Sequence, residues 1–458
     1  MSQIDFDALL RLLSFTPGEP MLFNSGLFLV LFLLFSAGYA LLSAQRAKAV
    51  RLLYVTAFSY YFYYKNAGAW CCLLAVITLV NYFCALRLDH TERPAARKAW
   101  LWLAVGFMLG QLAVFKYTDF AIGTWCDLTG EPRPDTPALP VLVGISFFTF
   151  QSMSYIIDVY RRQMPATRSL TDFAFFVSFF PTLLAGPILR ARTFLPQLAK
   201  PLRVTQQMLG TGTWFIIVGL FKKCVISDYI SVNFVSRIFD NPALYSGLEN
   251  LLGIYGYALQ LYCDFSGYSD MAIGIALWMG FEIPANFRAP YKSDSITDFW
   301  RRWHISLSSW LRDYLYISLG GNRKGRLRMY FNLFLTMLLG GLWHGASWNF
   351  VIWGSVHGFA LGVHKRFREL LGHDRHYQSR GIKRFFAVLL TFHLVCFCWL
   401  FFAGTSFEAS MQMIGQICSN FNPQLLPQFL EGYPLVSALM VGGFVLHFLP
   451  TAWNGKAE

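Results

Sequence analysis

Several long stretches of this chain contain no Asp, Glu, Lys or Arg, and they restrict the possible folds more than any other feature. Among them are residues 20–45, 66–86, 139–157 and 329–363. Runs of about 18 or more such residues are typical of helices that span a lipid bilayer. Charged residues make up only 14% of the 458 residues, whereas globular domains carry about a quarter. The sequence therefore predicts an all-α, polytopic membrane protein.

Apolar segments follow one another along almost the whole chain, which indicates a single integral membrane domain over residues 1–458. No soluble stretch exceeds about 45 residues. Roughly ten to twelve membrane segments are expected, some of them too short to cross a bilayer alone. The predicted segments are about 22–44, 52–64, 66–86, 99–116, 139–157, 173–189, 206–226, 248–281, 329–343, 346–364, 385–403 and 433–450.

The positive charge of the chain is spread over short loops rather than gathered in one basic domain. The formal net charge is +13, but the Lys and Arg residues lie between apolar runs, which excludes a nucleic-acid partner. Basic loops mark the cytoplasmic side of a membrane protein. We therefore expect the loops near 45–51, 160–168 and 365–384 in the cytoplasm, and those at 117–138 and 404–432 outside.

The segment 173–203 does not fit a simple in-and-out count. It is apolar up to Leu184, continues with Gly186-Pro187, and then carries Arg190 and Arg192. A re-entrant turn back to the basic side explains both the break and the charge, because irregular backbone is tolerated at membrane depth when protein shields it.

The most polar part of the chain, residues 282–328, is expected to be a cytoplasmic amphipathic and basic region. Ser295 and Asp298 have the spacing of a capping box that opens a helix. Beside the apolar face lie Arg301, Arg302 and Arg312, so the helix is expected to lie in the membrane interface. That face has three- and four-residue spacing through Ile296, Trp300, Trp303, Leu307, Trp310 and Tyr314.

His344 is the clearest candidate for chemistry, because ionisable groups within a bilayer are costly and often functional. Residues 329–364 lie between two basic stretches expected on the same side, so they must enter the membrane and return. About 15 helical residues reach roughly 22 Å, which puts His344 at the tip of a hairpin, between glycines. Imidazole is the usual general base near neutral pH. A structural histidine bonded between helices is the alternative.

Other polar residues are weaker candidates. His304 is read alone as an interfacial residue, and His357, His364, His393 and His447 as structural or interfacial ones. No HExxH pattern or paired CxxC units indicate a metal site. Asp264 and Asp270 interrupt an apolar helix, where a break at Ser266-Gly267 would let one of them face a cavity; capping or pairing with Arg is the alternative. The glycine-rich stretch 320–325 lacks Walker spacing and is read as an exposed basic turn.

Several strings are specific enough to identify a family resemblance. Residues 262–274 (YCDFSGYSDMAIG), 286–320 (beginning NFRAPYKS and including WRRWH) and 338–354 (LLGGLWHGASWNFVIWG) closely resemble the membrane-bound O-acyltransferase family. The match is to its bacterial branch typified by alginate O-acetyltransferase, and residues 144–151 and 179–188 resemble that branch too. The family core covers about residues 54–365, and the D-alanyl transferase of lipoteichoic acid is a more distant relative.

The resemblance implies a ring-like helical bundle with a central funnel in the bacterial inner membrane. It implies that His344 is the catalytic histidine and His304 a second important one. Asp264 falls in a motif of the branch, and Trp303 and Trp343 flank the two histidines as further candidates for substrate binding. The resemblance also implies a periplasmic serine-hydrolase-like partner and polysaccharide machinery.

The expected reaction is transfer of an acyl group, most simply acetyl, from a cytoplasmic thioester such as acetyl-CoA; no bound cofactor is expected. A neutral His344 would accept the proton of the attacking hydroxyl and return it to the leaving thiolate. Five basic residues are expected to bind the donor's phosphates: Arg301, Arg302, Arg323, Lys324 and Arg326. The preference for positive charge on the cytoplasmic side of a membrane protein also explains these residues without any ligand.

Three other functions stay open at this point. The acyl group could be D-alanine, or the acceptor peptidoglycan. The chain could instead be a transporter or flippase subunit of an export complex, in which His344 and Asp264 line a permeation path; that function predicts inverted repeats. A non-catalytic scaffold is the third alternative, and it predicts that His344→Ala leaves polysaccharide modification intact.

Overall fold

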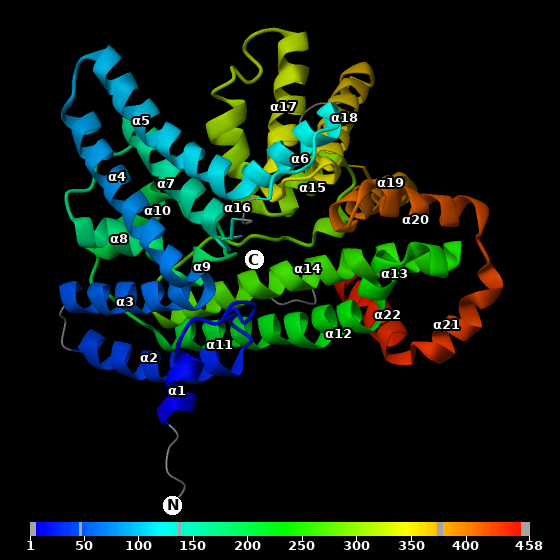
Figure 1. Cartoon of the computed structure of the whole chain (residues 1–458), viewed down its shortest axis with the longest axis horizontal. Helices are drawn as coiled ribbons and strands as arrows, with labels where there is room; N and C mark the ends of the chain where they lie inside the picture. The colour runs from blue at the N-terminus through cyan, green and yellow to red at the C-terminus, as the bar shows by residue number, and fades with distance from the viewer. Residues whose placement is uncertain (1–5, 45–47, 136–138, 141, 373–378, 450–458) are drawn as a thin grey trace, which may run out of the picture. The chain divides into compact units, whose positions relative to one another are not determined.

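The computed structural model describes residues 6–44, 48–135, 139–140, 142–372 and 379–449 (Figure 1). Within these residues every regular element is a helix, which confirms the predicted all-α class. The chain divides into two compact units, residues 1–217 with 268–284 and residues 218–267 with 285–458. Two of the basic loops expected in the cytoplasm include residues 45–47 and 373–378, which lie outside the described ranges.

The first unit contains the N-terminal helices, and α11 and α14 contribute to both units. Its elements are α1 (Phe6–Leu13), α2 (Gly26–Ala44), α3 (Lys48–Ala67), η1 (Gly68–Trp70), α4 (Cys71–His90), α5 (Pro94–Leu112), η2 (Ala113–Tyr117), α6 (Thr118–Thr129), α7 (Ile145–Tyr160), α8 (Leu170–Ser178), α9 (Phe180–Leu183), α10 (Ala191–Ala199) and α11 (Gln206–Leu220).

A buried arginine joins three neighbouring helices of this unit, α4, α5 and α7. Arg97 of α5 donates to the carbonyl groups of Leu88 and Thr91 at the end of α4, and to that of Tyr160 at the end of α7. These carbonyls belong to helix C-termini, which lack intrahelical donors and carry partial negative charge. One guanidinium group therefore caps two helices at once.

Among the described residues, four helical stretches are long and apolar enough to cross a membrane, judged by length and composition. They are Gly26–Ser43, Lys48–His90, Pro94–Thr129 and Gly381–Ala403. A fifth arises if Pro423–Gly432 and Pro434–Phe448, which meet at 104°, form one broken span. The other predicted segments coincide with helices that are shorter or more polar, so the number of ten to twelve stays a prediction.

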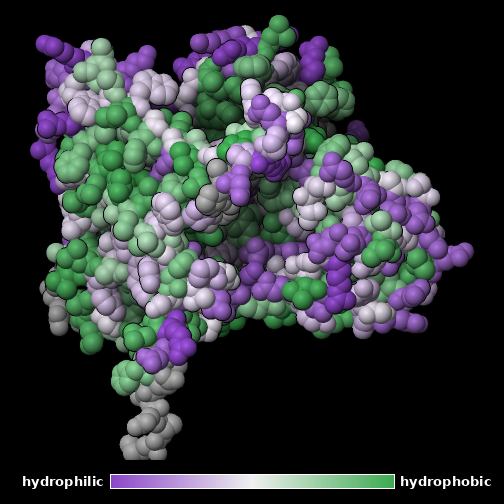
Figure 2. All heavy atoms as spheres, viewed as in Figure 1, coloured by the Kyte–Doolittle hydropathy of each residue, from purple (hydrophilic) through white to green (hydrophobic). Residues whose placement is uncertain are grey.

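Many large apolar side chains of these helices face outward. Leu33 and Leu34 of α2 and Leu390 of α19 are more than 60% exposed, and hydrophobic residues cover much of the face shown over α4 and α5 (Figure 2). Exposed apolar surface on this scale marks contact with a partner or with lipid. It fits a multi-pass membrane protein.

The break predicted near Gly186-Pro187 is present in the first unit. After α8 and α9, residues 184–190 are not helical, and α10 begins at Ala191. The side chains of Leu184, Ile188 and Leu189 are buried. Protein therefore shields this irregular backbone, as the re-entrant interpretation requires.

The second unit contains short and distorted helices followed by a long hairpin. Its elements are η3 (Phe221–Ser227), α12 (Asp228–Ile230), η4 (Ser231–Val235), α13 (Ser236–Asp240), η5 (Pro242–Leu244), α14 (Gly247–Trp278), η6 (Pro290–Lys292), α15 (Ile296–Arg302), α16 (Ile305–Trp310), η7 (Leu311–Tyr316), α17 (Arg326–His344), α18 (Trp348–Leu370), α19 (Gly381–Ala403), α20 (Phe407–Ser419), η8 (Pro423–Leu425), α21 (Leu426–Gly432) and α22 (Pro434–Phe448).

Glycine residues allow α17 and α18 to pack backbone against backbone in this unit (Figure 1). A Cβ atom at Gly354 would lie 2.5 Å from the carbonyl oxygen of Met337, and one at Gly341 would lie 2.3 Å from that of Phe350. Such close approach is possible only without a side chain, as in the small-residue interfaces of membrane helices. The predicted hairpin is thereby confirmed, with residues 345–347 as its turn.

The single amphipathic helix predicted from Ser295 to Tyr314 is wrong in two respects. The chain breaks at Trp303 and His304 between α15 and α16, and η7 continues as a π-helix. The apolar face is also buried within the protein, where Trp303 is 3% and Leu307 1% exposed, rather than lying against lipid. The predicted cap is confirmed, because the Oγ atom of Ser295 accepts from the amide of Asp298.

Candidate active site

His344 is the last residue of α17, at the tip of the hairpin. The rings of Trp343, Trp353 and Phe402 surround it edge-on, with centroids 4.9, 5.1 and 5.1 Å away. The residue is partly exposed, while its ring is held by packing against these aromatic side chains. At the next position only glycine fits, because a Cβ at Gly345 would lie 2.0 Å from the ring of Phe350.

His304 lies at the break between α15 and α16, with the left-handed backbone φ of +43°. Asn286 holds this conformation through hydrogen bonds to both its backbone and its side chain. Its backbone carbonyl accepts from the amide of Ile305, and its Oδ1 accepts from the amide and hydroxyl of Ser306. Strained backbone of this kind is found most often at functional sites.

The same amide oxygen fixes the tautomer of His304. The Nδ1 atom of His304 is 3.1 Å from Oδ1 of Asn286. Because that oxygen already accepts from Ser306, Nδ1 must donate its proton, and Nε2 carries the lone pair in the neutral ring. Burial lowers the pKa of His304 to about 3, so the ring stays neutral near pH 7. His304 lies outside the candidate spans.

Trp343 connects the two histidines. Its ring centroid is 6.1 Å from that of His304 and 4.9 Å from that of His344. On its other side, His304 contacts Phe265 of α14, edge to face at 4.6 Å. Segments far apart in sequence thus bring His304, Trp343 and His344 into one cluster, in which the WRRWH segment meets the α17–α18 hairpin.

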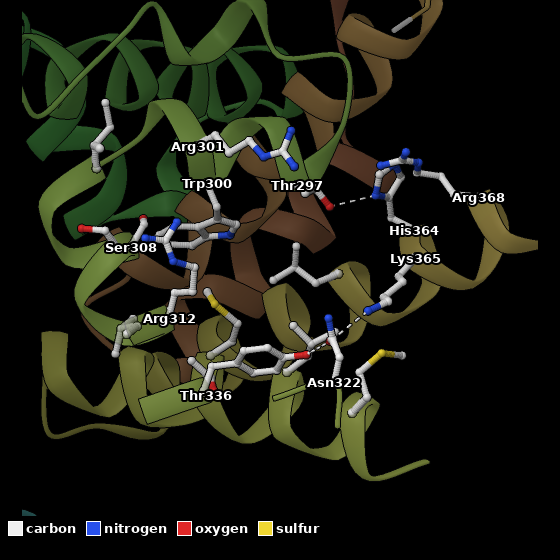
Figure 3. Close-up of a pocket in the computed structure, with 18 of the residues that line it drawn as sticks. Thr297, Trp300, Arg301, Ser308, Arg312, Asn322, Thr336, His364, Lys365 and Arg368 are labelled. Atoms are coloured by element: carbon white, nitrogen blue, oxygen red, sulfur yellow. Dashed lines mark hydrogen bonds between the residues drawn. The ribbon is translucent and has the colours of Figure 1, made fainter. Parts of the chain in front are cut away.

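A cavity of about 780 Å³ lies in the second unit, between α15–η7 and the α17–α18 hairpin (Figure 3). Apolar and polar side chains line it, including Trp300, Ser308, Thr336 and Met337. Met337 precedes His344 by seven residues on α17, or about 10 Å along a helix. The cavity therefore lies on the same hairpin as the candidate base.

Basic side chains dominate the charge around this cavity. Arg301, Arg312, Lys365 and Arg368 all line it, and Glu369 supplies the one carboxylate among the described residues that do so. Arg312 pairs with Asp313 at 2.8 Å, and Lys365 donates to Asn322.

Of the three arginines that line the cavity, Arg301 and Arg368 have no acidic partner among the described residues. Arg368 has a buried Nε without a hydrogen-bond acceptor there. Both groups act electrostatically on His364, which bonds Thr297 at 2.9 Å (Figure 3). Two such groups at the wall of one cavity suit an anionic ligand.

His304 and His344 do not line this cavity, and other candidate residues also lie outside it. Arg302 pairs with Asp298 at 2.8 Å, and Trp303 packs in the core against Phe299, Phe287 and Trp399. Arg323 and Lys324 are exposed on the turn after η7, which confirms that this glycine-rich stretch is an exposed basic turn.

Asp264 differs from expectation in its surroundings. Helix α14 continues through Ser266 and Gly267, so the break expected there is absent. The carboxylate pairs with Lys223 at 2.5 Å rather than with an arginine, and Lys223 also bonds Asp228 at 2.7 Å. Asp264 thus belongs to a three-membered ion-pair cluster beside Phe265, the residue that contacts His304.

The remaining histidines have identifiable contacts. His304 is 1% exposed, so the interfacial reading from sequence is wrong: the chain folds around it. His447 accepts from the amide of Tyr291, and His357 accepts from Trp300. Both are buried structural positions, as expected. His393 bonds the hydroxyl of Tyr255 at an exposed site.

Comparison with known proteins shows the family of this chain. A sequence model described as "MBOAT, membrane-bound O-acyltransferase family" matches residues 159–404, more than half of the chain. The chain belongs to this membrane-bound O-acyltransferase family. It is accordingly an O-acyltransferase, and both histidines and the cavity-lining residues fall within the matched range.

Three relatives show the range of reactions in this family. The chain is 42% identical to a probable alginate O-acetylase of Pseudomonas putida, over 96% of this chain and 88% of that protein. It is 36% identical to a peptidoglycan O-acetyltransferase of Helicobacter pylori, over 86% and 79%. A teichoic acid D-alanyltransferase of Bacillus subtilis is 33% identical over 61% and 73%.

Several residues of this candidate site are not indicated by the sequence alone. Asn286, which holds His304, begins one of the quoted motif strings but gives no signal of its own. Lys365 and Arg368 belong to a recognised basic loop, and they line the cavity because the last turns of α18 extend beyond the apolar run. Lys223, the ion-pair partner of Asp264, lies at the end of a predicted apolar segment, and nothing in the sequence indicates this pairing.

Proposed function

We propose that this protein transfers an acetyl group from a cytoplasmic thioester to a hydroxyl of a cell-surface or secreted polysaccharide. The observation that carries the proposal is the placement of His344, partly exposed at the hairpin tip, on the same two helices that line a basic cavity. The names of the alginate and peptidoglycan relatives support acetyl as the group and a polysaccharide as the acceptor.

His344 acts as the general base in this proposal. Its imidazole takes the proton of the acceptor hydroxyl while the oxygen attacks the thioester carbonyl carbon. The tetrahedral intermediate collapses, the carbon–sulfur bond breaks, and the imidazolium returns the proton to the thiolate. No metal or bound cofactor is needed in this sequence of steps.

His304 has a different role in the same reaction. Its Nδ1 donates to Asn286, so in the neutral ring Nε2 is the nitrogen with hydrogen-bond acceptor character. We assign it to orienting the hydroxyl or the thioester beside Trp343. Asp264, Trp303 and Arg302 do not line the cavity, and they support neighbouring elements instead.

The basic cavity is the donor site in this proposal. Arg301 and Arg368 bind the phosphates of an acyl thioester such as acetyl-CoA, and the apolar residues around Met337 accommodate the arm that carries the acyl group. Bidentate arginine contacts suit phosphate oxygens. The inner membrane and a periplasmic serine-hydrolase-like partner complete the proposal, since the acceptor polymer is exported.

A labelled-donor assay tests this function. The protein is reconstituted in proteoliposomes with [14C]acetyl-CoA on one face and polysaccharide, with its exported partner proteins, on the other. The proposal predicts label on the polysaccharide. Label on peptidoglycan only would show that peptidoglycan is the acceptor instead. Transfer only from a D-alanyl thioester would show that D-alanine is the acyl group instead. No transfer from any thioester would contradict the enzyme proposal and favour a scaffold.

A further inference from the structure

His357 of α18 is a buried histidine that the proposed reaction does not use. Its side chain is 0% exposed. It lies among three aromatic rings of the second unit, with centroids 4.7 Å from Trp353, 5.1 Å from Trp300 and 6.3 Å from Phe299. A polar ring in such apolar surroundings is costly unless it is hydrogen-bonded.

One hydrogen bond determines the state of this ring. The Nε1 atom of Trp300 is 3.3 Å from Nδ1 of His357. Because an indole nitrogen can only donate, Nδ1 must be the acceptor, and the neutral ring carries its proton on Nε2. His357 is therefore held as an acceptor for one specific indole.

The two tryptophans that contact His357 lead to different parts of the site. Trp300 lines the basic cavity. Trp353, one helical turn before His357, packs edge-on against His344 at 5.1 Å. Trp300 and Trp353 also contact each other at 5.7 Å. One buried histidine thus lies behind both the cavity wall and a ring that holds the candidate base.

We propose that His357 is a positioning residue for donor binding, which it controls by fixing the indole of Trp300 at the cavity wall. This inference rests on the proposed function, because it takes the cavity as the donor site. Without the acceptor at Nδ1, the buried Trp300 N–H loses its partner and the ring is free to rotate into the cavity. Donor binding weakens, while the packing of His344 by Trp343 and Phe402 is retained.

Two substitutions separate positioning from simple packing. His357→Leu keeps a side chain of similar size without an acceptor, and His357→Asn keeps an acceptor near the position of Nδ1. Loss of the hydrogen bond is expected to raise the dissociation constant of a non-transferable thioether analogue of acetyl-CoA about fivefold in His357→Leu. His357→Asn is expected to restore most of that affinity. The matched control is His393→Leu, which removes a histidine of α19 outside the cavity.

Trp300→Phe provides the second arm, because it removes the donor of the same hydrogen bond. The double variant Trp300→Phe/His357→Leu is expected to bind no more weakly than the weaker single variant, since both remove one interaction. If the fold-changes in dissociation constant of the two single variants multiply in the double variant, this would overturn the inference. So would unchanged analogue affinity in His357→Leu, or failure of His357→Asn to restore it in a protein with the wild-type melting temperature.

The binding readout keeps this inference distinct from the proposed function. If the wild-type protein binds the analogue but transfers no acetyl group, the proposed function fails and the positioning result stands as measured. If the wild type transfers acetyl and His357→Leu keeps both affinity and KM, the function stands and the role of His357 is refuted.

Discussion

His304 and His344 are fixed in the structure by different means. His304 is buried, and a hydrogen bond to Asn286 determines its tautomer. His344 is partly exposed and is held by the edges of three aromatic rings. A group held by a directed bond suits orientation, whereas an accessible ring suits proton transfer.

The depressed pKa of His304 predicts acid sensitivity. The folded state holds its pKa at about 3, whereas an unfolded histidine titrates near 6.5. Stability from the neutral ring is therefore fully present above pH 6.5, and is lost progressively as the pH falls toward 3. The loss approaches about 1.4 kcal/mol per pH unit below 6.5.

A variant checks the sign of this effect. His304→Asn keeps a donor for Asn286 and does not titrate. Between pH 7.5 and 5.5 its apparent melting temperature is expected to fall less than that of the wild type. An equal fall in both proteins would show that His304 is not the titrating group.

Substitutions at the cavity test donor binding by single residues. Arg301→Gln and Arg368→Gln each remove a guanidinium group that has no acidic partner in the described part of the chain. Each is expected to raise the KM for acetyl-CoA about tenfold, because a charge-assisted bond contributes roughly 1.5 kcal/mol or more. Lys383→Gln, an exposed position near the start of α19, removes the same charge elsewhere. An equal KM change in that control would indicate a general charge effect.

The sequence identifies His344 and His304 through their motifs, and hairpin length alone puts His344 at a tip. It cannot identify Asn286, because the hydrogen bonds that bend the chain at His304 come from a residue 18 positions away. Nor can it separate Arg301 from Arg302. Adjacent helical residues point in different directions. The structure shows that Arg302 is the one whose charge is paired, with Asp298.

At the level of elements, the α17–α18 hairpin depends on close backbone contact. Gly354→Ala would place a Cβ 2.5 Å from the carbonyl oxygen of Met337. The helices must separate, which is expected to cost about 1–3 kcal/mol and to lower both melting temperature and kcat by displacing His344. Gly362→Ala is the matched control on α18, since its Cβ meets only Tyr330 at 3.6 Å. Equal effects of the two substitutions would refute the packing argument.

The break between α15 and α16 shows where periodicity fails as a guide. Apolar spacing through residues 296–314 is that of one helix, and all of those side chains are indeed buried together. Tertiary hydrogen bonds to Asn286 outweigh the local preference, as they often do for short helices. Periodicity therefore predicted the buried face but not the continuity of the helix.

For the whole molecule, hydropathy was sufficient to predict an all-α membrane protein. A long apolar run in lipid must satisfy its own backbone hydrogen bonds, and a helix does so within a single segment. Hydropathy could not fix the number of spans. Segments such as 173–189 and 206–226 contain short or π-helical pieces, whose membrane placement depends on neighbouring helices rather than on their own length.

Topology mapping tests the arrangement across the membrane. An epitope tag inserted after Lys324, on the exposed basic turn, is expected to be protected in intact spheroplasts. A tag inserted after Asn420, an exposed residue following α20, is expected to be accessible, because basic loops stay in the cytoplasm. Access to both tags from one side would contradict the assignment of the basic cavity to the cytoplasmic side.

The catalytic role of one imidazole is tested most directly by the acetyl-transfer rate of purified His344→Asn beside the wild type, at matched protein amount and melting temperature. General-base catalysis contributes about 10²–10⁴-fold, so kcat should fall by at least about a hundredfold while analogue binding is unchanged. A kcat within threefold of the wild type would show that His344 does not transfer the proton.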